Sequence, residues 1–253
     1  MSVLDSFHLD DRVALVTGAS SGLGVAIAVA LAEAGCDVVV GARRVDRLAE
    51  TVSRIETTGR QALAVATDVS DPEDCAAMVD AAMERFGRVD VLVNNAGIGT
   101  AVPATKESPE QFREVIDINL NGSYWMAQAC GRVMQPGSSV INISSVLALT
   151  TAGLPQAAYA ASKSGLLGLT RDLAQQWAAR KGIRVNAIAP GFFPTEMTDE
   201  YLPGYVESLH HRILLGRMGE LSELAAAVVF LASPAAGYIT GQVIVVDGGV
   251  TIA

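Results

Sequence analysis

The sequence predicts an α/β protein with one doubly wound parallel sheet of about seven strands and helices on both faces. Short apolar runs alternate along the chain with longer segments whose apolar residues recur at helical spacing, and this alternation is typical of βαβ units. The short runs are apolar on both faces, as parallel strands covered from both sides require. The 253 residues exceed the usual domain length, but this class is routinely one unit, so residues 1–253 are expected to form a single domain.

The expected elements alternate from the N-terminus onward. The apolar runs place strands at residues 13–17, 37–42, 62–67, 89–94, 139–144, 184–189 and 242–246. The helical patterns between them place helices near residues 23–34, 45–58, 72–86, 108–134, 157–180 and 221–232. Connections between the parallel strands should be right-handed.

A glycine-rich turn separates the first expected strand from the first expected helix. Glycine lets the backbone turn sharply and approach a pyrophosphate, whose charge then lies at the helix N-terminus. Strand, glycine-rich turn and helix in this order predict a Rossmann-type dinucleotide site, although the spacing is Gly-x-x-x-Gly-x-Gly rather than Gly-x-Gly-x-x-Gly. The residues expected to bind the cofactor here are Gly18, Ser20, Ser21, Gly22, Leu23 and Gly24.

Two arginines, Arg43 and Arg44, follow the second expected strand. An acidic residue at this strand end holds the adenosine ribose in many dinucleotide-binding sheets, but Ala42 occupies that position here. Because a guanidinium can bind a phosphate bidentately, the sequence favours NADP(H), with its 2′-phosphate, over NAD(H), which stays possible. The alternative is that both arginines only begin the next helix and pair with Asp46 or Glu50.

Polar residues also follow the fourth and fifth expected strands. Asn95, Ala96 and Gly97 follow the fourth, and Ser144 and Ser145 end the fifth. Polar groups at the carboxyl ends of parallel strands lie where open α/β sheets bind ligands, although both residue types also form turns. A serine hydroxyl in this position can donate a hydrogen bond to a substrate carbonyl oxygen.

Tyr159 and Lys163 stand four residues apart in the alanine-rich helix expected at 157–180, so they share one face. A phenol has a pKa of about 10 in water and transfers protons slowly at neutral pH. A neighbouring ammonium favours the phenolate, which makes the phenol a usable acid or base. The pair therefore indicates a proton-transfer site, whereas by itself it would suit an ordinary helix with a surface lysine.

In this order, the segments TGASSGLG, NNAG, the serine pair and YAASK resemble those of the short-chain dehydrogenase/reductase family. The resemblance extends from about Leu9 to the C-terminus. It implies an oxidoreductase that transfers a hydride between NADP(H) and a carbonyl or secondary alcohol. Tyr159 would donate a proton to the carbonyl oxygen, while Lys163 would lower the pKa of the phenol and bind the nicotinamide ribose.

The resemblance also implies roles for residues whose local pattern is less specific. Asn119 would hold a water that relays protons to the lysine, unless its amide only bends its helix. Asp68 and Val69 would frame the adenine, although an aspartate after a strand is also a common helix cap. Further cofactor contacts are implied for Tyr159, Lys163, Pro190, Gly191, Phe193 and Thr195.

One spacing departs from the family pattern. Thirteen residues separate Ser145 from Tyr159, one more than is usual between the catalytic serine and tyrosine. Either Ser145 is catalytic and the loop carries one extra residue, which costs little at a surface, or the pocket wall is rearranged and Ser144 replaces it. We favour Ser145. The extra residue falls within 147–156, which should line the substrate pocket, so a relative's substrate does not transfer safely.

The segment 191–216 is too long for an ordinary connection in a compact domain. Such segments are commonly substrate lids, and Met197, Tyr201, Leu202 and Tyr205 could face an apolar substrate. A satellite hydrophobic cluster is the equal alternative.

The amino-acid composition limits which partners and which cellular compartment are expected for this protein. A net charge of −9 disfavours nucleic acid, and no apolar run approaches the roughly 18 residues of a membrane span. Residues 1–12 do not resemble a secretory signal. The three cysteines are far apart, which argues against a disulfide framework or zinc site and fits the cytoplasm. No metal spacing is present among the histidines.

The leading hypothesis is an NADP(H)-dependent ketone reductase or alcohol dehydrogenase, with a 3-oxoacyl thioester as one candidate substrate. The alternatives are an NAD-dependent alcohol or sugar-acid dehydrogenase, and a non-catalytic cofactor-binding regulatory or scaffold protein. The intact Ser, Tyr, Lys and Asn set favours catalysis. The resemblance further implies a homo-oligomer, tetramer or dimer, through helices 108–134 and 157–180. Their interface contacts, or else core positions of a monomer, would be Ala127, Ala129, Gly165, Leu166, Leu169 and Leu173.

Overall fold

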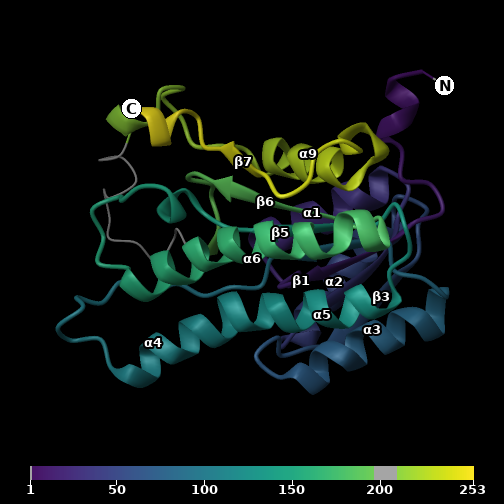
Figure 1. Cartoon of the computed structure of the whole chain (residues 1–253), viewed down its shortest axis with the longest axis horizontal. Coiled ribbons are helices and arrows are strands. Elements are labelled where there is room, and N and C mark those ends of the chain that lie inside the picture. Colours follow the sequence, from purple (N-terminus) through teal and green to yellow (C-terminus); the bar gives the residue numbers. More distant parts are fainter. Residues whose placement is uncertain (1, 197–209) are drawn as a thin grey trace.

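The computed structural model describes residues 2–196 and 210–253, and its central feature is a seven-stranded parallel sheet (Figure 1). The strands lie in the order β3-β2-β1-β4-β5-β6-β7. Their bounds are β1 Val13–Thr17, β2 Asp37–Ala42, β3 Ala62–Ala66, β4 Val91–Asn94, β5 Ser139–Ile143, β6 Arg184–Pro190 and β7 Val243–Val246. The strand order reverses between β1 and β4, which is where sheets of this class bind ligands.

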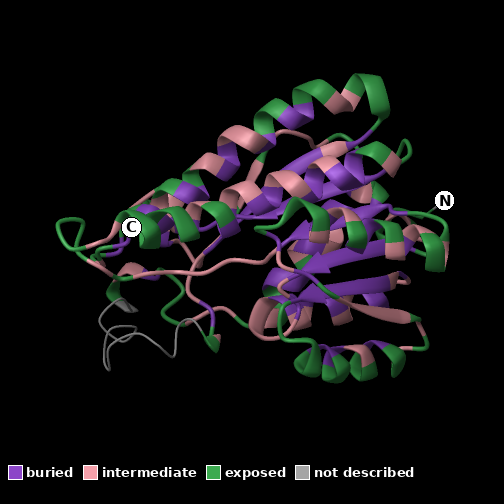
Figure 2. Ribbon diagram, turned by 90° about the horizontal axis from the view of Figure 1, so that it is seen from below, coloured by how far each residue is buried: buried purple, intermediate pink, exposed green. Residues whose placement is uncertain are grey.

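Helices cover both faces of the sheet (Figures 1 and 2). One layer contains α1, α2 and α9, and the other contains α3, α4, α5 and α6. Their bounds are α1 Gly22–Glu33, α2 Val45–Glu56, α3 Pro72–Phe86, α4 Pro109–Ile116, α5 Gly122–Val133, α6 Ala157–Lys181 and α9 Leu221–Ala232. The predicted fold class is confirmed.

Two hydrophobic cores follow from the strand period of two. In β1, Ala14 and Val16 belong to the core beneath α1 and α9, while Val13 and Leu15 belong to the core beneath α3 and α5. Every residue of β1 is buried. The continuous apolar run seen in the sequence therefore reflects burial of both sheet faces.

The expected boundaries differ from the structure in two informative places. β4 begins at Val91 rather than at residue 89. The backbone of Asp90 still bonds to Val13 and Ser139, and its carboxylate accepts hydrogen bonds from the backbone N–H of Val13 and from Arg88. The single helix expected at 108–134 consists of α4 and α5 joined by a π-helical turn, Asp117–Asn121. Hydrophobic periodicity cannot distinguish one π turn from a continuous α-helix.

The expected lid and the membrane-span expectation concern parts of the chain other than the sheet. In the expected lid at 191–216, residues 197–209 lie outside the described residues, including the four side chains expected to face a substrate. Within the described part of the chain, no helix is long and apolar enough to cross a membrane.

Candidate active site

A cavity of about 540 Å³ opens at the carboxyl ends of the strands, around the reversal of strand order. It extends from the arginines after β2, here called the adenosine end, to the Tyr159 and Lys163 side chains of α6, here called the reaction end. All residues expected to contact the cofactor line it: Gly18, Ser20, Ser21, Gly22, Leu23, Gly24, Arg43, Arg44, Asp68, Val69, Asn95, Ala96, Gly97, Tyr159, Lys163, Pro190, Gly191, Phe193 and Thr195.

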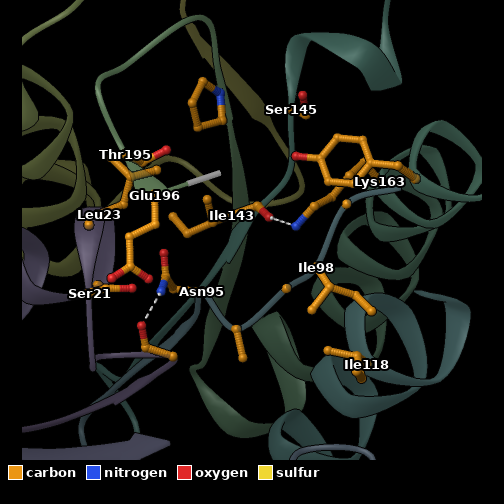
Figure 3. A pocket seen from close by; sticks show the side chains of 18 of the residues that line it. Ser21, Leu23, Asn95, Ile98, Ile118, Ile143, Ser145, Lys163, Thr195 and Glu196 are labelled. Atoms are coloured by element: carbon orange, nitrogen blue, oxygen red, sulfur yellow. Dashed lines mark hydrogen bonds between the residues drawn. The ribbon is translucent and has the colours of Figure 1, made fainter. Parts of the chain in front are cut away.

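The glycine-rich turn is held tightly against the end of β4. The amide of Asn95 donates to the carbonyl oxygens of Thr17 at 2.9 Å and Gly18 at 3.1 Å. Figure 3 shows the Asn95 side chain with one of these bonds. Gly18 has φ +66°, and a Cβ on Gly24 would lie 2.3 Å from the Gly18 oxygen. Glycine is therefore required at both positions, by backbone conformation at one and by close approach at the other.

The N-terminus of α1 faces this cavity with its backbone donors uncapped by a side chain. Ser21, the N-cap, makes no side-chain capping bond, whereas Asp71 caps α3 and Ser108 caps α4. An open helix N-terminus beside close-packed glycines fits the pyrophosphate of a dinucleotide. Asp71, and not Asp68, thus performs the helix-capping role that was the alternative for Asp68.

Asp68 is instead bonded locally. Its carboxylate accepts hydrogen bonds from the hydroxyl of Ser70 at 2.7 Å and from the Ser70 backbone at 3.0 Å. The Ser70 hydroxyl is the main reason that the pKa of Asp68 is lowered. Asp68 is consequently a fixed carboxylate on the rim of the cavity.

The two arginines after β2 differ in their contacts. Nη2 of Arg44 donates to the hydroxyls of Ser20 and Ser21, each at 3.3 Å, and to Glu196 at 3.1 Å. Arg43 is exposed at the cavity rim. Arg44 is the N-cap of α2, so it does stand at the start of the next helix. In the described part of the chain Arg44 pairs with Glu196 and neither arginine pairs with Asp46 or Glu50, so the pairing in that alternative is wrong.

At the reaction end, Lys163 is buried and its ammonium donates to the carbonyl oxygen of Ile143 at 2.8 Å (Figure 3). Its Nζ lies 5.7 Å from the ring centroid of Tyr159. Burial lowers the pKa of Lys163 to about 8, because desolvation disfavours the charged form. The helix spacing read from the sequence therefore brings a phenol and an ammonium together inside one cavity.

The two serines after β5 have different partners. The Ser144 hydroxyl donates to the carbonyl oxygen of Lys163 at 2.9 Å. The Ser145 hydroxyl lies at the reaction end (Figure 3) and accepts a hydrogen bond from the backbone of Leu147 at 3.1 Å. Accepting that bond leaves the Ser145 proton for another partner, so the geometry favours Ser145 over Ser144 as a donor to a substrate.

Asn119 lies in the π-helical turn, fully buried. Its Oδ1 accepts from the backbone N–H of Ile98 at 2.8 Å. Its Nδ2 donates to the Ile98 carbonyl at 2.9 Å and to Ser162 at 3.0 Å. A Cβ on Gly97 would lie 3.2 Å from Oδ1 and 3.3 Å from Nζ of Lys163, so the amide and the ammonium flank the same backbone position.

Comparison with known proteins agrees with this geometry. The family model described as enoyl-(acyl carrier protein) reductase matches residues 18–251. The chain is 41% identical over 252 residues to 2-dehydro-3-deoxy-D-gluconate 5-dehydrogenase of Dickeya dadantii (strain 3937), covering 98% of each protein. It is 40% identical over 249 residues to the 3-oxoacyl-acyl-carrier-protein reductase of Synechocystis sp. (strain ATCC 27184 / PCC 6803 / Kazusa), covering 96% of this chain and 98% of that protein.

A solved structure shows the same likeness across the whole fold. Gluconate 5-dehydrogenase from Burkholderia cenocepacia J2315, in complex with NADP and tartrate, matches with a TM-score of 0.93 at 36% identity and covers 100% of both chains. This chain belongs to the short-chain dehydrogenase/reductase family.

As a short-chain dehydrogenase/reductase, the protein is an oxidoreductase that uses a nicotinamide dinucleotide and acts on a carbonyl or secondary alcohol group. The resemblance carried by the motifs is thereby confirmed, and the non-catalytic scaffold hypothesis loses its support.

Several residues of the site were missed by sequence reasoning. Thr17 accepts hydrogen bonds from the backbone of Asn95 and Ala96, each at 3.1 Å, which joins β1 to the segment after β4. Glu196 lines the cavity beside the glycine-rich turn. Thr17 precedes Gly18 and Glu196 follows Thr195, both of which the sequence motifs had assigned. A threonine or a glutamate at such a position does not by itself indicate a role in the site.

The expectation for residues 147–156 holds in part. Of these residues, all described, Leu147 lines the cavity. Ile98, Val146, Leu147 and Phe192 also line the cavity, and the motifs had assigned none of them. Of these, Ile98 and Leu147 pack against the cluster that contains Tyr159 at the reaction end.

Proposed function

We propose that the protein is an NADP(H)-linked oxidoreductase for an uncharged, largely apolar ketone and its secondary alcohol. The observation that carries the substrate class is the lining of the reaction end. Around Tyr159, Ser145 supplies a hydroxyl, whereas Ile98, Val146 and Leu147 supply apolar surface.

The charge pattern supports an uncharged substrate. Among the described cavity-lining residues, the cations are Arg43 and Arg44 at the adenosine end and the catalytic Lys163. Residues 197–209 contain no lysine or arginine in sequence. A substrate carboxylate at the reaction end would be desolvated without a guanidinium partner, which is costly.

The catalytic roles rest on the hydrogen-bonding capacity of these side chains and, for the ribose and water contacts, on the family resemblance. A bound nicotinamide dinucleotide supplies or takes up the hydride at the carbonyl carbon. Tyr159 delivers its phenolic proton to the carbonyl oxygen and Ser145 donates a hydrogen bond to the same oxygen as charge builds there. Lys163 stabilises the phenolate and binds the ribose hydroxyls. Asn119 fixes the Ile98 backbone beside Lys163 and holds the water that returns protons to it.

The substrate proposal is tested with a matched pair of 3-oxo compounds, the ethyl ester and the free acid, with NADPH as cofactor. We expect kcat/KM for the ester to exceed that for the acid by about tenfold or more, since an unpaired carboxylate costs at least about 1.4 kcal/mol on entering an apolar site. Faster turnover of the free acid, or of 5-dehydrogluconate, would overturn the apolar substrate class.

A sugar acid is the second candidate, because two named relatives are 2-dehydro-3-deoxygluconate and gluconate 5-dehydrogenases. One observation favours it. Nη1 of Arg212 donates to the carbonyl of Thr151 at 2.8 Å, which places a guanidinium beside the segment 147–156 that includes the cavity-lining Leu147. If a sugar acid is the substrate, Arg212→Ala should raise its KM at least tenfold and leave the KM of an uncharged ketone unchanged.

The preference for NADP(H) rests on charge at the adenosine end. Ala42 leaves this strand end without a carboxylate, and Arg44 points its guanidinium at the glycine-rich turn. Arg43 lines the same end of the cavity. Arg43→Ala and Arg44→Ala should each weaken NADPH binding and leave NADH binding nearly unchanged. A higher kcat/KM of the wild type with NADH would overturn the preference.

Two broader features belong to the same proposal. The enzyme is a homo-oligomer, a tetramer or dimer, and it acts in the cytoplasm, which fits three buried cysteines that are all free. Of the side chains expected at its interface, Ala127, Ala129, Leu166 and Leu173 are buried within the single chain. Gly165 and Leu169 on α6 are only partly buried, so these two stay available for an interface.

A further inference from the structure

Glu196 places a carboxylate at the adenosine end of the cavity, beside Ser21 (Figure 3). Its Oε2 accepts a hydrogen bond from Nη2 of Arg44 at 3.1 Å, and its Oε1 accepts one from Nη1 of Arg47. These bonds, with one from Ser21, hold the pKa of Glu196 below its usual value, and the Arg44 bond is the largest cause. The carboxylate is therefore ionised at neutral pH.

The groups around this carboxylate form a site for an anion. The guanidinium nitrogen of Arg44 that binds Glu196 is also 3.3 Å from the hydroxyls of Ser20 and Ser21. The uncapped N-terminus of α1 begins one residue later, at Gly22. Arginine and hydroxyl donors converging beside a helix N-terminus bind a phosphate as readily as a carboxylate. Here the anion is a side chain of the protein itself.

NADP(H) and NAD(H) differ in the group that each would bring to this anion site. NADP(H) carries a 2′-phosphate on its adenosine ribose, whereas NAD(H) carries a neutral hydroxyl. A phosphate bound by Arg44 would meet the Glu196 carboxylate at the same nitrogen, and two anions cannot share that donor without repulsion. A neutral hydroxyl brings no such repulsion.

We propose that Glu196 is a specificity-determining residue, a built-in competitor that occupies Arg44 and Arg47 and must leave before a cofactor phosphate can bind there. The inference rests on the proposed use of NADP(H). Its consequence is that Glu196 weakens NADPH binding selectively, and so narrows the difference in affinity between the two cofactors.

The expected effect is moderate. The side chains of Arg44 and Glu196 are 47% and 52% exposed, so solvent screens their attraction. Exposed pairs of this kind are worth up to about fivefold in an equilibrium constant. Because screening grows with salt, the effect should shrink as ionic strength rises.

The test measures dissociation constants by calorimetry, without turnover. Wild type and Glu196→Gln are titrated with NADPH, NADH, 2′,5′-ADP and 5′-AMP at low and high salt. Glutamine keeps the shape and removes the charge. Glu56→Gln is the matched control, since it removes one negative charge from the exposed far end of α2.

We expect Glu196→Gln to bind NADPH and 2′,5′-ADP about two- to fivefold more tightly, with NADH and 5′-AMP changed less than twofold and with Glu56→Gln like wild type. Unchanged NADPH affinity would overturn the inference while leaving the proposed function intact. Loss of NADH affinity alone would also overturn it, since Glu196 would then act as the ribose acceptor. A wild type that binds neither dinucleotide would instead overturn the proposed function and the inference with it.

Discussion

Lys163 is a site residue whose buried charge lowers the folding stability of the protein. Its ammonium is buried, and among the described residues its hydrogen-bond acceptor is the carbonyl of Ile143. Desolvation lowers its pKa from 10.5 to about 8. The unfolded chain therefore holds its proton up to a higher pH than the folded protein does. Folding stability rises as pH increases from about 8 toward 10.5, and the full cost of the buried charge is present below pH 8. A lysine stabilised by a carboxylate would show the opposite pH dependence, with folding stability falling as pH rises.

Lys163→Met should therefore change the pH dependence of stability. Methionine fills a similar volume without charge, so the cofactor-free variant should be more stable than wild type at pH 7 by on the order of 1 kcal/mol, after loss of one hydrogen bond. The advantage should vanish toward pH 10, where the wild-type lysine is neutral when folded. Urea unfolding between pH 7 and 10 measures this, and a difference independent of pH would contradict it. Turnover should be lost throughout.

Tyr159→Phe should separate chemistry from binding. Removing the phenolic oxygen eliminates the proton donor, so turnover should fall by about 10² or more. The ring remains, so melting temperature and the dissociation constant of NADPH should change little. Tyr124→Phe is the control, because the Tyr124 hydroxyl contacts Gln128 on α5 rather than the cavity. Turnover close to that of wild type in Tyr159→Phe would remove the tyrosine from its proposed role.

At the scale of elements, the site depends on how closely α1, the glycine-rich turn and the segment after β4 approach one another. The close approach leaves no room for a side chain at Gly24, where a Cβ would lie 2.7 Å from Nδ2 of Asn95 as well as against the Gly18 oxygen. Loss of this packing would move the N-terminus of α1 away from the cofactor phosphates.

Gly24→Ala should lower the melting temperature and weaken NADPH binding by about tenfold or more, since backbone atoms must move to admit the methyl group. Gly168→Ala on α6 is the control, because a Cβ there meets nothing within 4 Å among the residues that the structure describes. That variant should be as stable as wild type or up to about 1 kcal/mol more stable, through helix propensity. Thermal melts and NADPH titrations of both variants provide the comparison.

At the scale of the whole molecule, exposed apolar side chains gather near the β7 edge and the C-terminus. Leu214, Leu215, Val245 and Ile252 are 61%, 67%, 40% and 82% exposed, and the backbone of Leu215 bonds to Gly248 in the segment after β7. β7 is an edge strand of the sheet. An edge strand with neighbouring apolar surface commonly pairs with another copy.

Light scattering at micromolar concentration should therefore give two or four times the chain mass of 26.3 kDa. Ile252→Asp should lower the measured mass by placing a charge in this surface. Val3→Asp should leave it unchanged, although Val3 is 78% exposed, because it lies at the other end of the molecule (Figure 1). A wild type of single-chain mass would contradict the oligomer.

The sequence by itself determined the sheet, its helices and most of the site. Strand burial on both faces appears as continuous apolar runs, and motif residues such as Gly18 and Tyr159 act through backbone conformation or helix spacing, which are local properties. The tertiary structure alone showed how two adjacent residues differ in their contacts: the Ser144 hydroxyl donates to the Lys163 carbonyl whereas the Ser145 hydroxyl accepts from Leu147, and Arg44 lies against the glycine-rich turn. It alone brought Glu196 to Arg44, across 152 residues of chain. Side-chain direction at strand ends and contacts between distant loops depend on packing among several elements, and no local pattern records that packing.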